Sequence, residues 1–423
     1  MPKEIDQNVF ESILEPVNSM IKESGNDIED DEEKYNLSFV PFTKNLLFGI
    51  ICNIKTRAQL ITEIKTSPTA DKLNMNKSSS ASYTEAFSRY NAKMFQNIFI
   101  QLLSSLNLMS IPGIDKLGMF MLVDGSIFPV IKTMTWATYK STANAIKLHL
   151  ALNLNQMTPT EYICTNANYS ERKFLTDILT RGITYICDRG YVGFKSFKVI
   201  CEHGAFFIIR CKASIKHVVR ESFVIDLPCD VIGLLQNVKD MRIVFKNDKN
   251  RNRNNEKIEY RMVTFTAMGE SYCIVTNRFD LTTYEIIMLY AYRWQIELIF
   301  LFIKRTQNCI HQLSHDPNGI EIQFHLYMIA YLLLLAFKQK CVSLEEEDNK
   351  CEAMDKDVIE NNGIEFFENN RHNQGRYYVR GLVSMLGEKL HKYWKIGLHW
   401  LITIKNLLLE PLTKFTIKVI AQG

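Results

Sequence analysis

The sequence lacks several features that would place it outside the cell, in a membrane or among ATP-driven enzymes. Its ten cysteines are scattered and form no C-x-x-C pair, which disfavours a disulfide scaffold or zinc ribbon and predicts reduced thiols in the cytosol. The longest apolar run, Leu326–Phe337, is too short to span a bilayer, so it predicts a buried helix. Residues 1–34 are polar and acid-rich, and no signal peptide is expected. No G-x4-G-K-S/T segment suggests an ATP-driven step.

Basic charge is spread unevenly along the chain. The formal net charge is +4, but residues 27–33 hold six acids, and residues 345–360 hold eight acids and two bases. Outside these two segments the chain carries 48 basic and 32 acidic residues. A basic body with acidic segments set apart suits a nucleic-acid partner. By themselves, the acidic segments favour an interpretation as solvated linkers, which leaves the basic body unexplained.

Length and composition predict a multidomain globular protein. With 423 residues, of which 47% are hydrophobic and 23% charged, two or three domains are expected. We predict that residues 1–116 form a helical region that binds DNA, with helices over 39–64 and 83–107 and a polar loop at Thr66–Ser80. Ser82-x-x-Glu85 predicts the start of the second helix as a capping box. The same pattern also fits any small helical bundle.

From residue 117 the pattern changes to short β-branched and apolar runs that predict strands. Helical segments at Ser170–Leu179 and Gly193–Glu202 lie between them, so we expect an α/β domain over residues 117–340 with a mixed sheet and packed helices. A block at residues 213–275 predicts a β insertion. The expected strands are Met119–Val123, Ala145–Leu154, Thr160–Thr165, Ile183–Cys187 and Ala205–Cys211, followed in the insertion by His217–Ile225, Met241–Phe245, Glu259–Ala267 and Tyr272–Val275.

The last part of the chain predicts further helices. Ile320–Lys340 is expected to be helical, and residues 341–423 are expected to form an acidic linker followed by a helical region over about 375–409. That final stretch carries many large apolar side chains. They either complete a local core or form a patch that a partner covers.

The segment Ile286 to Ile303 is almost entirely apolar. Its polar exceptions include Tyr290, Arg293 and Glu297, and Lys304 follows it directly. At about 100° per residue in one continuous helix, the four side chains share an arc of about 60°. Thr282-x-x-Glu285 predicts the start of this helix. A buried Arg or Glu is costly unless it is paired, metal-bound or facing a ligand. A narrow polar stripe on a buried helix therefore indicates a site for a polyanion and its metal.

Two aspartates end predicted strands and add to this stripe. Asp124 follows the strand in LVDGS and Asp188 follows the strand in YICDRGY, and Gly125 and Gly190 permit tight turns after them. Together with Glu297 they supply three hard oxygen ligands, which suit Mg²⁺ or Mn²⁺. Two such ions can activate water and stabilise the leaving oxygen of a phosphodiester.

Three basic side chains are weaker candidates for DNA contacts. Lys147 and His149 alternate on one strand next to the expected site, so both are expected to face DNA, with an exposed strand face as the alternative. Arg189 follows Asp188 directly, so it either touches a phosphate or serves as a surface turn residue.

The spacing Tyr290-x2-Arg293-x3-Glu297-x6-Lys304 resembles the Y-R-E-K signature of the IS4-type insertion-sequence transposases, which are DDE enzymes. On the order of 0.01 or fewer such matches are expected by chance in a chain of this length. The run AYRWQIELIFLFIKR and the upstream IVTNRFDLTTYEI resemble the same family, as do the LVDGS and CDRGY strands. The resemblance is specific over about residues 117–340 and weak elsewhere.

The resemblance implies a ribonuclease-H-like mixed sheet with helices on both faces and a β insertion between the second Asp and the Glu. It implies that Asp124, Asp188 and Glu297 are catalytic and hold two Mg²⁺ or Mn²⁺ ions, and that Tyr290, Arg293 and Lys304 contact DNA-end phosphates. The implied partners are double-stranded terminal inverted repeats and target DNA, bound by a homodimer assembled on DNA. The implied location is the nucleoid in a prokaryotic cytoplasm, with no membrane partner.

Two other functions remain open from sequence. One is a catalytically silent DNA-binding derivative of a transposase, although retention of all three carboxylates disfavours it. The other is a ribonuclease-H-like nuclease that never joins strands. A metal-dependent cleavage assay separates the first from a transposase, and a strand-transfer assay with a pre-cleaved end separates the second.

Overall fold

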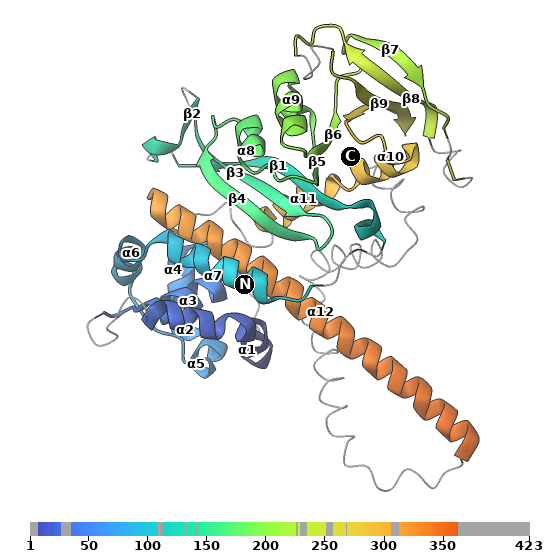
Figure 1. Cartoon of the computed structure of the whole chain (residues 1–423). Helices are drawn as coiled ribbons and strands as arrows, with labels where there is room; N and C mark the ends of the chain where they lie inside the picture. Colours follow the sequence, from blue (N-terminus) through green and yellow to red (C-terminus); the bar gives the residue numbers. More distant parts are fainter. Residues whose placement is uncertain are drawn as a thin grey trace. The chain divides into compact units, whose positions relative to one another are not determined.

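A computed structural model describes residues 7–26, 35–108, 111, 113–131, 134–140, 143–225, 227–228, 235–250, 257–267, 269–305 and 313–362 (Figure 1). The described chain groups into two compact units. One contains the N-terminal helices up to Leu108 and the last helix from His325 onward, and the other contains residues 111–324. This division differs from the expected boundaries at 116 and 340, because the second part of the last helix groups with the N-terminal helices.

The first unit is helical, and its helices are shorter than the sequence pattern suggested. The expected helix over 39–64 is interrupted near Asn53, whose φ of 59° lies in the left-handed region. The expected helix over 83–107 is interrupted at Tyr90–Asn91. The helices are α1 (Gln7–Leu14), the 3-10 turn η1 (Glu15–Val17), α2 (Asn18–Asn26), α3 (Phe39–Ile51), α4 (Arg57–Thr66), α5 (Pro68–Lys72), α6 (Ser80–Arg89) and α7 (Ala92–Ser105).

The expected capping box at Ser82 is wrong. Helix α6 begins at Ser80, and its N-cap is Ser79, whose hydroxyl accepts a hydrogen bond from the backbone N–H of Ser82. Several serines in a row offer alternative caps, and only packing selects among them. Arg89, in the last turn of α6, stacks its guanidinium 3.6 Å from the centroid of the Tyr35 ring and pairs with Glu85.

Helix α12 (Pro317–Asn362) is longer than expected. The sequence predicted a helix over Ile320–Lys340 and then a linker, but the helix continues through the acidic residues 345–360. Glu, Lys and Met are good helix formers, so this segment has no local reason to end the helix. The expected helical stretch over 375–409 lies outside the described residues.

The second unit is built on a mixed sheet with ten strands among the described residues. Its order is β2-β3-β1-β5-β6-β10-β9-β8-β7, and β4 pairs with β3. Strands β1, β3 and β4 are antiparallel neighbours, and β1, β5 and β6 are parallel. The strands are β1 (Met119–Val130), β2 (Thr138–Lys140), β3 (Ala143–Asn153), β4 (Thr158–Asn166), β5 (Ile183–Cys187), β6 (Phe206–Arg210), β7 (His217–Ser222), β8 (Leu235–Phe245), β9 (Tyr260–Ala267) and β10 (Glu270–Thr276).

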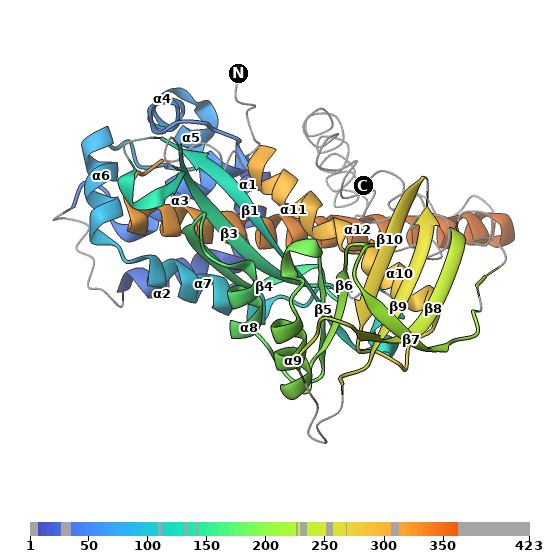
Figure 2. The same cartoon turned by 90° about the horizontal axis from the view of Figure 1, so that it is seen from above.

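The expected β insertion is present and extends the sheet. Strand β10 pairs antiparallel with β6, and β9, β8 and β7 follow in antiparallel order (Figure 2). The insertion therefore adds four strands between the strand before Asp188 and the helix that carries Glu297. The short turns η2 (Ile114–Leu117), η3 (Thr135–Ala137) and η4 (Arg189–Tyr191) complete the strand connections.

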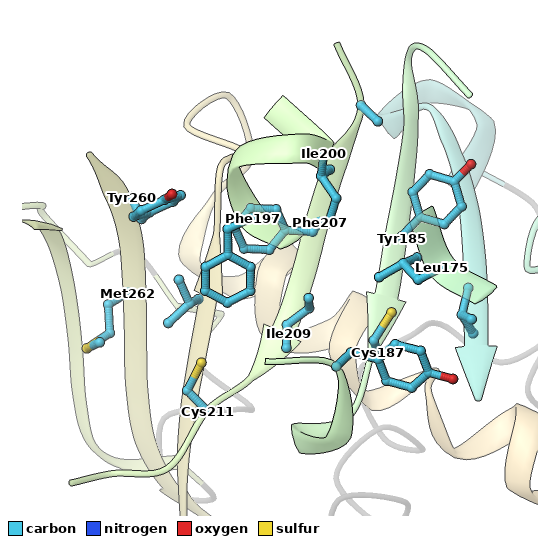
Figure 3. Packing of buried hydrophobic residues seen from close by; sticks show 14 of the residues in the cluster. Leu175, Tyr185, Cys187, Phe197, Ile200, Phe207, Ile209, Cys211, Tyr260 and Met262 are labelled. Carbon is cyan, nitrogen blue, oxygen red and sulfur yellow. The ribbon is translucent and has the colours of Figure 1, made fainter. Parts of the chain in front are cut away.

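Helices α8 (Glu171–Asp177) and α9 (Phe194–Glu202) cover one face of the sheet. Their core includes Phe197, whose ring stacks on that of Phe207 with centroids 4.6 Å apart (Figure 3). Because successive strand residues face opposite sides, the alternate buried residues Leu122 and Ile186 face the other side. Helices α10 (Thr283–Ala291) and α11 (Trp294–Arg305) pack there, where α11 contacts β1 and α10 contacts β6.

Two apolar helical stretches, Thr283–Lys304 and Pro317–Lys340, are long and apolar enough to cross a membrane by length and composition alone. Most of each stretch is buried inside the protein. Packing in a core therefore accounts for their apolar character.

Candidate active site

The register of β1 and β5 brings two aspartates together. The parallel ladder between these strands ends at the pair Val123–Cys187, so Asp124 is the next residue of β1 and Asp188 directly follows β5, with extended backbone. Both have the same alternation as Leu122 and Ile186 and so face α10 and α11. The Asp124 carboxylate accepts the N–H of Gly125 at 2.7 Å, and the Asp188 carboxylate accepts the N–H of Gly190 at 2.8 Å.

The local structure around Asp124 differs from the expectation. Strand β1 does not end before Asp124 but continues to Val130, with Asp124 opposite Leu150 and Gly125 opposite His149 on β3. Gly125 is thus in a strand and not in a turn. The sequence pattern did not indicate this, because DGS is typical of a turn and only the long partner strand β3 keeps the chain extended here.

The helix that carries the polar stripe is not continuous. The capping box of Thr282 and Glu285 at the start of α10 is confirmed. However, α10 ends at Ala291 and α11 begins at Trp294. Between them the turn is tightened by bonds to the third preceding residue, including Arg293 N–H to Tyr290 C=O at 3.0 Å. The expected arc of about 60° assumed one continuous helix, so it does not describe the positions of the four side chains on two separate helices.

Arg293 nevertheless joins the helix to the aspartates. Its guanidinium lies 2.5 Å from Glu297 Oε1 and 3.7 Å from Asp124 Oδ2. Arg293 and Asp124 are nearly buried, with side chains 15% and 16% exposed. The structure thus places one guanidinium between two carboxylates, Asp124 and Glu297, at the end of the β1–β5 ladder where Asp188 also lies.

The electrostatics of Asp124 reflect this crowding. Burial, and then the neighbouring Asp188 carboxylate, raise the pKa of Asp124 to about 7, with a smaller contribution from Glu297. The Gly125 N–H and the Arg293 guanidinium act in the opposite direction. Tyr290 is also buried, and burial raises the pKa of its hydroxyl while Arg293 lowers it. Burial and the neighbouring carboxylates therefore disfavour the ionised form of Asp124.

The residue types fit a divalent cation. Within the described residues, no three His, Cys, Asp or Glu side chains already stand in the geometry of a metal site. Asp124, Asp188 and Glu297 nonetheless supply hard oxygen ligands whose mutual repulsion a cation would relieve.

The remaining candidate residues occupy different positions. Lys304 lies on α11 with its ammonium 4.7 Å from the centroid of Phe128, which is on β1 and on the same face as Asp124. Arg189 is exposed in η4, directly after Asp188. Lys304 therefore lies on the face of the sheet that carries Asp124, and Arg189 lies at the strand end next to Asp188.

Lys147 and His149 face the opposite side of the sheet. They pair in register with Ile127 and Gly125, on the face covered by α8. The expectation that His149 faces DNA is wrong for this structure, and so is the exposed-strand alternative, because the ring is 0% exposed and packs against Phe174. Burial, and then Lys147, lower the pKa of His149 to about 4. Lys147 is buried and forms an ion pair with Glu171.

Sequence reasoning missed a buried ion pair that supports α10. Asp240 on β8 and Arg261 on β9 are fully and nearly fully buried and lie 2.6 Å apart. The Thr283 hydroxyl donates to Asp240 at 2.7 Å, and Arg261 donates to the Leu281 carbonyl at 2.5 Å. The insertion thus holds the first turn of α10. An arginine in an otherwise apolar strand indicates a buried charge that needs a partner. The sequence does not indicate that this partner is Asp240, 21 residues earlier on the neighbouring strand.

Comparison with known proteins now adds to the geometry. Residues 116–333 match the family described as Transposase DDE domain, and this match covers more than half of the chain. The chain therefore belongs to this family of transposases. The ribonuclease-H-like α/β fold expected from the sequence is confirmed. Membership also implies that the chemistry of the domain depends on a divalent metal.

Three relatives each match about half of the chain. The chain is 29% identical over 220 residues to a protein named transposase y4zB from Sinorhizobium fredii, covering 51% of this chain and 60% of the relative. It is 24% identical to a protein from Synechocystis sp. named as a transposase for insertion sequence element IS4SA, covering 49% and 59%. It is 23% identical to one from Geobacillus stearothermophilus named for element IS5377, covering 50% and 55%. The alignments span less than two thirds of each relative's length.

Proposed function

We propose that this protein is the DNA transposase of an IS4-type insertion sequence, which cuts DNA at terminal inverted repeats and joins the ends to target DNA. The observation that carries the proposal is the meeting of Asp124 and Asp188, set side by side by the β1–β5 register, with Arg293 from the α10–α11 junction and Glu297 from α11. The names of two relatives as transposases for insertion sequence elements support it.

Asp124, Asp188 and Glu297 would hold the metal, which we propose to be two Mg²⁺ or Mn²⁺ ions. When bound, such ions activate the attacking oxygen and stabilise the leaving oxygen of a phosphodiester. Asp124 would be the central ligand, because its side chain is nearly buried and both Asp188 and Glu297 act on its pKa. Its neighbours Gly125 and Arg293 fix the orientation of its carboxylate.

Four side chains would position the DNA backbone. Arg293 and Tyr290 lie at the junction of α10 and α11, Lys304 lies farther along α11, and Arg189 is exposed beside Asp188. Phosphoryl transfer depends largely on positioning and charge stabilisation, which suits cations that flank the carboxylates. Arg293 already pairs with Glu297 in the protein without DNA. Its guanidinium is therefore held in advance at the position where a phosphate next to the scissile bond would bind.

The proposed partner is double-stranded DNA, both the terminal inverted repeats and the target. Two ends are cut and joined together only when two active sites act in one complex, so we propose a homodimer assembled on DNA. We propose the prokaryotic cytoplasm, at the nucleoid, as the location. The helical N-terminal unit contributes DNA contacts in this proposal, supported by the exposed Lys72 and Lys93.

The test is metal-dependent cleavage of the DNA that flanks the gene. Glu297→Gln keeps the side-chain shape but loses the charge that holds a divalent cation. We expect cleavage of end-labelled flanking DNA in Mg²⁺ to fall by at least about a thousandfold, while binding in a gel shift stays within a few fold.

Glu202→Gln is the matched control. Glu202 is an exposed glutamate on α9 that pairs only with Lys198 among the described ion pairs, so this variant should cut at the wild-type rate. Near wild-type cleavage by Glu297→Gln would show that the carboxylate assignment is wrong. Wild-type protein that binds the ends without cutting them would indicate a silent derivative. Cutting without transfer of a pre-cleaved end would indicate a nuclease.

A further inference from the structure

A buried ion pair lies behind the candidate active site. Lys147 on β3 and Glu171 at the start of α8 pair on the face of the sheet opposite Glu297. Their side chains are only 10% and 25% exposed. None of the functions proposed above uses this pair, and a buried ion pair is by itself weak evidence for stability. Its neighbours give a more specific indication.

The pair occupies space that two glycines leave open. A Cβ on Gly125 would lie 2.7 Å from Lys147 Cε, and a Cβ on Gly190 would overlap Glu171 Oε2. Neither glycine has a positive φ, so backbone conformation does not require glycine at either position. The requirement is close approach: one ion pair packs against the residue that follows Asp124 and against the second residue after Asp188.

The same two glycines orient the catalytic carboxylates. Gly125 N–H donates to Asp124 Oδ1 at 2.7 Å, and Gly190 N–H donates to Asp188 Oδ1 at 2.8 Å. A shift of either glycine therefore moves the donor that sets the direction of a proposed metal ligand. Loss of a hydrogen-bond partner that orients a metal ligand commonly weakens metal binding by about 10–100-fold.

We propose that the Lys147–Glu171 pair is a positioning element that fixes Gly125 and Gly190 and thereby orients Asp124 and Asp188 for metal binding. This inference rests on the proposed function, because it concerns the same site. The pair does not touch DNA or the reacting atoms. It acts through the two glycine N–H groups, from the face of the sheet that α8 covers.

The test uses Gly190→Ala, the double variant Lys147→Ala/Glu171→Ala, and all three substitutions combined. Mn²⁺ alone is titrated into DNA-free, full-length protein by calorimetry, and thermal unfolding is recorded in EDTA. We expect Gly190→Ala to weaken Mn²⁺ binding at least about tenfold and to lower the melting temperature. The double variant should also weaken Mn²⁺ binding about tenfold, because the support is gone.

The combined variant is the decisive one. With the pair removed, the added methyl group no longer overlaps Glu171, and its nearest remaining neighbour is Asp188 Oδ1 at 3.1 Å, a close contact that a shift of a few tenths of an ångström relieves. Gly190→Ala should therefore cause a much smaller further loss of affinity and melting temperature than it causes alone. Gly193→Ala is the matched control in the same loop, since its Cβ would approach no atom closer than 3.3 Å, and it should bind Mn²⁺ like wild type. If Gly190→Ala alone fails to fold, removal of the pair should restore folding.

The outcomes separate this inference from the proposed function. Additive losses, or wild-type Mn²⁺ affinity in Gly190→Ala and in the double variant, would overturn the positioning role while leaving the metal site intact. Wild-type protein that neither binds Mn²⁺ nor cuts DNA would overturn the proposed function itself. Cleavage assayed against Mn²⁺ concentration should show the same shift, with unchanged DNA-end affinity, which a purely structural role would not produce.

Discussion

The buried Asp240–Arg261 pair should make a single uncharged substitution very costly. Asp240→Asn keeps the shape of the side chain but leaves the Arg261 guanidinium, 6% exposed, without its anionic partner. Breaking a buried pair by removing one partner costs about 3–5 kcal/mol, because the remaining charge is desolvated and uncompensated. For a unit of roughly 200 residues this corresponds to a fall in melting temperature of roughly 6–20 °C.

The matched control lies two residues away on the same strand. Arg242 pairs with Glu221 at 3.0 Å and Glu259 at 3.3 Å, but these side chains are 34%, 54% and 41% exposed. Exposed pairs contribute about 0–1 kcal/mol. Arg242→Gln should therefore change the free energy of unfolding by less than about 1 kcal/mol, although it removes two ion pairs where Asp240→Asn removes one.

Removal of both charges completes the test. Asp240→Leu/Arg261→Met leaves no unpaired buried charge, so it should be more stable than Asp240→Asn, even though more polar contacts are lost. Urea unfolding of the full-length protein, monitored by fluorescence and circular dichroism, measures all three variants. If Asp240→Asn costs no more than Arg242→Gln, or if the double variant is the least stable, the reasoning from burial is refuted.

Three further predictions concern the site and assembly. Burial and Asp188 raise the pKa of Asp124 to about 7 in the folded protein, so ionisation of this carboxyl opposes folding above pH 7. In EDTA, Asp124→Asn should therefore raise the free energy of unfolding by about 4 kcal/mol above pH 7. This gain should shrink as the pH falls from 7 toward 4, and an equal gain at pH 5 and pH 8 in denaturant titrations would contradict it. Arg293→Ala and Lys304→Ala should each lower the log–log salt slope of DNA-end binding by about 0.9, and unchanged slopes would assign both side chains to packing or internal pairing. Deletion of residues 375–423, which lie outside the described residues, should abolish paired-end complexes in native gels but leave single-end binding, and a paired complex formed by the truncated protein would exclude this segment as the interface.

Local sequence signals predicted the elements well where one segment contains all the information. β-branched runs located most strands to within a few residues, and Ile183–Cys187 agrees with β5 at both ends. The capping box at Thr282 correctly marked the start of α10, because both partners lie within one turn. The Y-R-E-K spacing led to the family. These features depend on neighbours at most a few residues apart.

Other features depend on pairing that the chain cannot express locally. Alternation correctly placed Lys147 and His149 on one face, but only the β1–β3 register decided that this face lies under α8 and not under α11. A shift of one residue in that register would have exchanged the two faces. Likewise the DGS segment looks like a turn, and only pairing with β3 keeps Gly125 extended.

The sequence by itself determined the order of strands and helices, the β insertion and the residues able to hold a metal, because periodicity, capping and motif spacing are local. Only the tertiary structure decided which side chains meet. It set Asp124 beside Asp188 through a parallel register, brought Arg293 to both Glu297 and Asp124, and paired Lys147 with Glu171 behind two glycines. Such contacts join residues far apart in the chain, and their energy comes from burial and charge compensation that exist only after the sheet and helices have packed.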